Sequence, residues 1–124
     1  MKNKKVIFNK ISIIGIGYVG LPLALAVSKK YKTVAYDKNL QRIQELKKRN
    51  DKNNTEKIFL NKNLSFTNSK SNLKNSDIFI VTVPTPINKN NKPDLSFLIE
   101  ATKLISEYLN KDNIVIYEST VFPG

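Results

Sequence analysis

Cysteine and histidine are absent from this chain of 124 residues. Without cysteine the chain has no disulfide, no thiolate metal site and no cysteine nucleophile, and without histidine it lacks the commonest general base and metal ligand. We therefore expect no metal site in this chain and no catalytic residue of either type.

Long apolar runs are also missing. No segment approaches the roughly 18 consecutive apolar residues that a membrane span requires. The start, MKNKKVIFNKISIIGIG, is basic and then apolar like a signal peptide, but glycines interrupt the apolar run and no small-residue cleavage site follows. The sequence therefore predicts a cytoplasmic chain without a membrane segment.

Acidic residues are few, 10 against 21 basic ones, so the formal net charge is +11. Such a balance is typical of nucleic-acid binders, whose affinity for their ligand falls steeply with salt. Here, however, the lysines are dispersed from Lys2 to Lys111. We favour anionic small ligands or general solubility as the explanation of the charge and expect no nucleic-acid partner, although nucleic-acid binding stays open as an alternative function.

The hydrophobic pattern alternates between short β-branched runs and amphipathic stretches. It predicts strands over 11–14, 33–37, 64–69, 77–84 and 113–120, and helices over 21–30, 39–49 and 94–109. Between them, 50–63 reads as a loop or a short helix. The alternation of strands and helices indicates that the strands pair in parallel. We expect an α/β fold, a Rossmann-type doubly wound parallel sheet of strand order 3-2-1-4-5, formed by one domain over residues 1–124.

The last of these helices carries apolar side chains at helical spacing. Asp94 stands where a helix cap is expected. The spacing predicts one core-facing stripe, which comprises Leu95, Leu98, Ile99, Thr102, Ile105 and Leu109.

Three of the four glycines, Gly15, Gly17 and Gly20, lie within six residues, in GIGYVG. This G-x-G-x-x-G follows a predicted strand and opens a predicted helix, as in dinucleotide-binding proteins. Gly15 permits the tight turn, Gly17 lets a pyrophosphate approach the backbone, and Gly20 lets the helix pack closely. The phosphates would then meet unpaired N–H groups and the positive end of the helix dipole.

Asp37 ends the second predicted strand, seventeen residues after Gly20. An acid at this place accepts hydrogen bonds from the adenosine ribose and repels a 2′-phosphate, so NAD is favoured over NADP. Lys38 and Arg42 are the residues that weaken this inference. The alternative is that the glycines make only a tight turn and that Asp37 is only a helix cap. Tyr18 has two interpretations, packing and cofactor contact.

Two further segments end predicted strands, at the edge where open α/β sheets bind ligands. One brings Val83, Pro84 and Thr85 over the cofactor crevice, unless these residues only stop the strand. The other brings Glu118 and the Ser-Thr pair after it to the same edge. Asp77 begins its strand at the opposite edge and reads as a cap or turn residue.

Taken together, these residues resemble the N-terminal region of the nucleotide-sugar 6-dehydrogenases, the UDP-glucose/UDP-N-acetylhexosamine dehydrogenase family. The resemblance lies in SIIGIGYVGLPLALA, AYDKNLQRI, DIFIVTVPTPI, KPDL and IVIYESTVFPG, and it leaves only 50–76 without a signature. VPTPI, KPDL and ESTVFPG are more similar to the members acting on UDP-N-acetyl-glucosamine, -galactosamine or -mannosamine than to those acting on UDP-glucose.

The resemblance implies oxidation of the C6 alcohol of a UDP-sugar to a carboxylate, in two hydride transfers to NAD through a thiohemiacetal and a thioester on a cysteine. It also implies a set of NAD-binding positions, with Thr120 as a possible accessory that holds a water near the reacting carbon. Val83 stands where some UDP-glucose enzymes have threonine. The positions implied in NAD binding are Tyr18, Val19, Asp37, Arg42, Thr85 and Thr120.

The resemblance further implies that the nucleophilic cysteine, the central helix and the UDP-sugar-binding domain lie outside this chain. We therefore expect an NAD-binding domain that is not catalytic alone. The parent enzyme is expected to be a homodimer whose product feeds capsule or surface-polysaccharide synthesis. A stand-alone NAD-responsive binding module remains as the alternative.

Overall fold

The computed structural model describes residues 8–51 and 62–118. A five-stranded sheet in the order β3-β2-β1-β4-β5 forms its centre, and every neighbouring pair of strands is parallel. This is the fold class and the strand order that the sequence predicts. The strands are β1 Lys10–Ile14, β2 Lys32–Tyr36, β3 Leu64–Thr67, β4 Ile78–Val81 and β5 Ile114–Tyr117.

β1 is the central strand, paired with β2 on one side and β4 on the other. Its side chains alternate between two apolar layers: Ile11 and Ile13 belong to one buried cluster and Ile14 to the other. Both faces are therefore covered, which is why this strand is a nearly continuous β-branched run.

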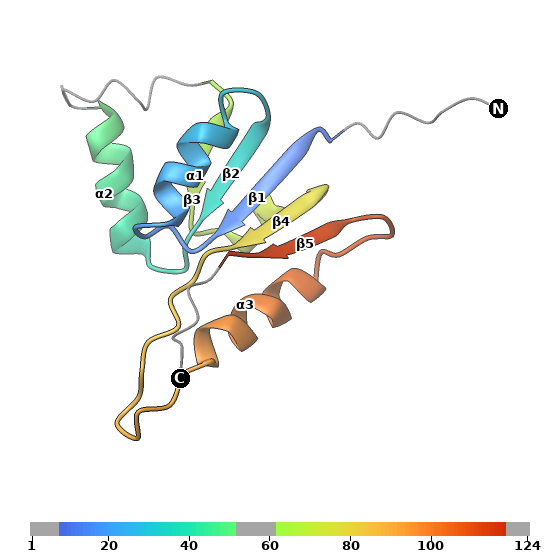
Figure 1. Ribbon diagram of the computed structural model, residues 1–124. Coiled ribbons are helices and arrows are strands. Elements are labelled where there is room, and N and C mark those ends of the chain that lie inside the picture. Colours follow the sequence, from blue (N-terminus) through green and yellow to red (C-terminus); the bar gives the residue numbers. More distant parts are fainter. Residues whose placement is uncertain (1–7, 52–61, 119–124) are drawn as a thin grey trace.

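The first face of the sheet is covered by α1 Gly20–Val27 and α2 Leu40–Asp51. Ala24 from α1, with Ile43 and Leu46 from α2, packs against the β-strand side chains. Figure 1 shows the two helices on the β1–β3 half of the sheet. α1 ends at Val27, three residues before the predicted end, because the next N–H groups make tighter turns, such as Lys30 N to Val27 O at 3.1 Å.

The second face is covered by a short 3₁₀ helix, η2 Lys70–Leu73, and by α3 Ser96–Ser106. Figure 1 shows α3 running beside β5. Next to η2, the hydroxyls of Ser12 and Ser76 hydrogen bond to each other in the interior, so β1 carries a satisfied polar pair on this face.

The predicted stripe of α3 is wrong in part. Leu98 and Ile105 face the core as expected, but Ile99 is 54% exposed, and Leu95, Thr102 and Leu109 are exposed as well. The residues that pack inward are Leu98, Ala101, Leu104, Ile105 and Tyr108. The helix carries two overlapping stripes of apolar residues, and the stripe that packs against the sheet is the one that contains Ala101 and Leu104.

β4 is shorter than predicted. The strand ends at Val81; Thr82 makes one more bond, from its N–H to the Ile14 carbonyl at 2.8 Å, and Pro84 has no N–H to continue. At the other end of the strand, Asp77 accepts the N–H groups of Asn9 and Lys10, at 2.8 and 3.0 Å. Asp77 therefore ties down the start of β1, a structural role that differs from the cap or turn that the sequence predicts.

Candidate functional site

The carboxyl ends of β1, β2 and β4 meet at one edge of the sheet. The N–H of Gly15 donates to the Tyr36 carbonyl at 2.8 Å, so the exit of β1 is bonded to the end of β2. From β1 the chain proceeds toward β2 and later crosses to β4 on the other side, which makes this edge a topological switch point. Such points form ligand crevices in open α/β sheets.

Gly15 makes the turn out of β1. Its φ of +96° lies in the region that side chains rarely adopt, and an added Cβ would lie 2.9 Å from the backbone of Val83. The glycine therefore permits the turn that the sequence predicts, and it also permits close contact with the segment after β4, which the sequence does not reveal.

The other two glycines of the motif have opposite surroundings. A Cβ on Gly20 would overlap the carbonyl oxygen of Gly15 and lie 2.6 Å from the Thr82 hydroxyl oxygen, so α1 packs directly onto the loop and the end of β4. A Cβ on Gly17 would meet nothing within 4 Å. Gly20 is thus needed for packing, whereas the bare face of Gly17 opens onto a cavity.

The start of α1 suits an anion. The hydrogen bonds found among the described residues include none from the N–H groups of Gly17, Tyr18 or Val19, and no side chain caps the helix. The first turn also contains no acidic residue. The N–H groups and the positive end of the helix dipole are therefore available to phosphate oxygens.

Asp37 joins two loops at this edge. One carboxylate oxygen accepts the N–H of Ile16 at 2.9 Å and the other accepts the N–H of Asn39 at 2.9 Å. Asn39 itself caps α2, because its side-chain oxygen accepts the Arg42 N–H at 3.3 Å. The interpretation of Asp37 as only a helix cap is therefore wrong, although the residue does have a structural role that the sequence does not reveal.

Arg42 holds the glycine loop from the other side. Its Nε donates to the Ile16 carbonyl at 2.8 Å, and its Nη1 bonds the Glu45 carboxylate at 3.1 Å. Both backbone groups of buried Ile16 are thus fixed by side chains, one from Asp37 and one from Arg42. These bonds position the glycine loop.

A cavity of about 1020 Å³ lies over these residues. It is lined by most of the predicted cofactor-binding positions, while Gly20 packs beneath it and Thr120 lies outside the described residues. Tyr18 is 99% exposed at the cavity, so it does not pack into the domain. The predicted residues that line the cavity are Gly15, Gly17, Tyr18, Val19, Asp37, Arg42, Val83, Pro84 and Thr85.

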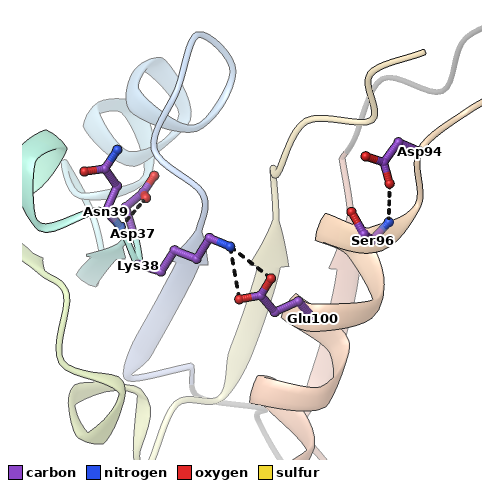
Figure 2. A network of polar contacts seen from close by, with 6 residues as sticks. All are labelled: Asp37, Lys38, Asn39, Asp94, Ser96 and Glu100. Carbon is purple, nitrogen blue, oxygen red and sulfur yellow. Dashed lines mark hydrogen bonds and ion pairs between the residues drawn. The ribbon is translucent and has the colours of Figure 1, made fainter. Parts of the chain in front are cut away.

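The opposite wall of the cavity comes from α3 and contains residues that the sequence analysis did not select. Phe97, Glu100 and Ala101 line it. Figure 2 shows Lys38 reaching from the end of β2 to Glu100, where its ammonium lies 3.1 and 2.9 Å from the two carboxylate oxygens. The available signal was topological: α3 is the first helix after β4, so its start must lie near the same edge.

Tyr36 forms part of the floor between these walls. Burial raises the pKa of Tyr36, and the neighbouring carboxylates of Asp37 and Glu100 raise it further. Its phenol therefore stays protonated at neutral pH. Within residues 8–51 and 62–118, no group of three potential metal-ligating side chains occurs and no helix is long and apolar enough to cross a membrane.

A glycine-rich turn leading into a helix, an acid after β2 and a crevice at the switch point define a dinucleotide-binding Rossmann domain. The sequence agrees with this class. Residues 9–124 match the profile of the UDP-glucose/GDP-mannose dehydrogenase family, NAD binding domain, and the chain belongs to this family. NAD is accordingly the cofactor of the domain.

Several relatives resemble the chain over nearly all of its length. It is 46% identical to UDP-N-acetyl-D-glucosamine 6-dehydrogenase of Salmonella typhi, covering 93% of this chain and 28% of that protein. It is 45% identical to Protein CapL of Staphylococcus aureus, covering 92% and 27%. The solved UDP-D-ManNAc dehydrogenase of Pyrococcus horikoshii superposes with a TM-score of 0.80 at 30% identity, covering 93% and 29%. The chain therefore spans less than a third of the length of these relatives.

Proposed function

We propose that this chain is the NAD-binding domain of a UDP-N-acetylhexosamine 6-dehydrogenase, which oxidises the C6 alcohol of its sugar to a carboxylate in two NAD-dependent steps. The observation that carries the proposal is the open face of Gly17 in a crevice that also contains Asp37. The substrate class rests on relatives named as UDP-N-acetyl-D-glucosamine and UDP-N-acetyl-D-mannosamine dehydrogenases.

Different residues of the crevice bind different parts of the cofactor. The N–H groups at the start of α1 receive the pyrophosphate. Each Asp37 oxygen accepts one backbone N–H and keeps a second lone pair, which accepts a ribose hydroxyl. Val83, Pro84 and Thr85 border the nicotinamide side, and Thr120 is proposed to join them. NAD, when bound, supplies the hydride acceptor for the oxidation.

We further propose that residues 1–124 form one domain of a longer cytoplasmic, homodimeric protein, whose other part supplies a nucleophilic cysteine and the UDP-sugar site. The outer strand supports this proposal. Ile114 and Ile116 of β5 are 42% and 36% exposed, and the apolar cluster that α1 and α2 cover includes residues of β1 to β4 but none of β5. Apolar side chains on an edge strand favour cover by further protein.

The relatives also suggest what the product is for. Protein CapL and the UDP-N-acetyl-mannosamine dehydrogenase Cap5O, which superposes with a TM-score of 0.78 at 29% identity, are both from Staphylococcus aureus. We propose that the uronic acid product enters surface-polysaccharide synthesis, as in a capsule.

The test is expression of the complete open reading frame that contains this chain. Purified protein is mixed with NAD and with UDP-N-acetyl-glucosamine, -galactosamine, -mannosamine or UDP-glucose, and NADH is followed by its absorbance. The proposal expects two NADH per sugar with at least one N-acetylhexosamine substrate. A reading frame that stops after Gly124, in a protein that binds NAD without turnover, would instead establish the NAD-responsive binding module.

A further inference from the structure

Two cations flank the acid that faces the ribose, and each is already bonded to a carboxylate. Lys38, the next residue after Asp37, bonds both oxygens of Glu100 on α3, at 2.9 and 3.1 Å. Arg42 bonds Glu45 at 3.1 Å and the Ile16 carbonyl at 2.8 Å. With Asp37 included, the five charged groups leave one net negative charge at this end of the crevice.

This pairing bears on the choice between NAD and NADP. NADP differs from NAD by a phosphate on the adenosine ribose, the sugar whose hydroxyls Asp37 is placed to bind. Sites that accept this phosphate present a cation to it. Lys38 lines the same cavity as Asp37, but Glu100 directs its ammonium toward α3, as Figure 2 shows.

We propose that Glu100 is a specificity-determining residue, which acts through Lys38: by binding the ammonium it withholds from NADP a flexible cation that adjoins Asp37. The inference rests on the proposed binding of NAD in this crevice. Glu100 is 62 residues from Lys38 in the sequence and is brought to it only by the position of α3 beside β4.

A second residue of α3, Phe97, also attracts the Lys38 ammonium toward this helix. The Lys38 ammonium lies over the Phe97 ring, 5.4 Å from its centroid. Phe97 and Glu100 are one helical turn apart, so α3 presents a ring and a carboxylate to the same ammonium. The side chains of Lys38 and Glu100 are 56% and 59% exposed, so solvent screens their attraction and the effect of removing the carboxylate is modest.

The test compares the affinities of NAD and NADP for the 124-residue chain and for Glu100→Gln, by calorimetric titration at low salt. Released Lys38 is free to pair with the 2′-phosphate, and one negative charge is lost. We expect the ratio of NADP affinity to NAD affinity to rise by up to about five-fold, the upper end of the range set by exposed ion pairs. Added salt is expected to reduce the rise.

Glu107→Gln is the matched control. It removes the same charge from the C-cap of α3, about 10 Å from Glu100 along the helix axis. It also releases a lysine that lines the same cavity but does not adjoin Asp37, namely Lys70, which Glu107 binds at 3.2 Å. The affinity ratio should not change in this variant. In Lys38→Met/Glu100→Gln the gain should disappear, because no released ammonium remains, and Glu100→Asp should keep most of the wild-type ratio.

An unchanged ratio in Glu100→Gln, with NAD still bound, would overturn the inference and leave the proposed function intact. An equal rise in Glu107→Gln, or a rise that persists without Lys38, would also overturn it, because the effect would then come from net charge alone. Failure of the folded wild-type chain to bind NAD would overturn the proposed function together with the inference. Circular dichroism on each sample establishes that it is folded.

Discussion

Substitution of Gly17 by alanine should separate cofactor binding from folding. An added Cβ at this position meets no atom within 4 Å, and its φ lies outside the range that side chains rarely adopt. The methyl group therefore occupies only the space into which we place the pyrophosphate. For an ordinary loop glycine, by contrast, a substitution that blocks a ligand commonly strains the fold as well.

The substitution should raise the free energy of unfolding and lower the affinity for NAD. Alanine restricts the unfolded chain more than glycine does, so the free energy of unfolding should rise by about 0.4–1 kcal/mol. In the crevice, the methyl group keeps a phosphate away from the N–H groups at the start of α1. Loss of one charge-assisted hydrogen bond costs about 1.5–3 kcal/mol, which corresponds to NAD binding weakened roughly ten- to hundred-fold.

The assay is a pair of measurements on the same sample: urea unfolding followed by circular dichroism, and calorimetric titration with NAD. Gly17→Ala should be at least as stable as wild type while it binds NAD much more weakly. Undiminished NAD affinity would refute the pyrophosphate cradle. A loss of more than about 1 kcal/mol in stability would refute the claim that the position carries no packing constraint.

The opposite pattern is expected for Gly20→Ala, whose Cβ overlaps the Gly15 carbonyl oxygen; urea unfolding should show a loss of about 2–3 kcal/mol. Asp37→Ala removes the carboxylate placed to bind the ribose, so calorimetry should show weaker NAD binding. It also leaves the N–H groups of Ile16 and Asn39 without their acceptor, so the free energy of unfolding should fall by about 1–2 kcal/mol. Full stability in this variant would contradict the structural part of the role of Asp37. Burial raises the pKa of Tyr36 in the folded chain, so the phenol of the unfolded chain loses its proton at a lower pH than that of the folded chain. The free energy of unfolding of wild type, measured relative to that of Tyr36→Phe, should therefore be constant below about pH 10 and fall as the pH rises above it. A difference that does not change across that range would refute the raised pKa.

The elements that the sequence predicted well are those specified by local patterns. The turn at Gly15 and the helix after Gly20 follow from glycine placement and hydrophobic period, and both are present. The strand predicted over 64–69 lies at Leu64–Thr67. The segment 50–63, predicted as a loop or a short helix, falls largely outside the described residues, apart from the last two residues of α2 and the two positions before β3.

The inward face of α3 could not be predicted in full, because Ile99 and Leu104 both lie on plausible apolar stripes. Only contact with the sheet buries one and leaves the other exposed. The same limit applies to the support of the glycine loop. Nothing local in the sequence indicates that Arg42 bonds the Ile16 carbonyl, 26 residues earlier.

By itself, the sequence determined the glycine turn after β1 and the class of fold, because hydrophobic period and glycine conformation act over a few neighbouring residues. The order of the strands followed from the fold class. The tertiary structure decided which charges meet. The pairing of Lys38 with Glu100 and the bonds of Asp37 and Arg42 to Ile16 exist only once β1, β2 and β4 end at one edge and α3 packs beside them. Electrostatic and hydrogen-bond partners depend on distance in space, and separation along the chain carries no information about that distance until the sheet is formed.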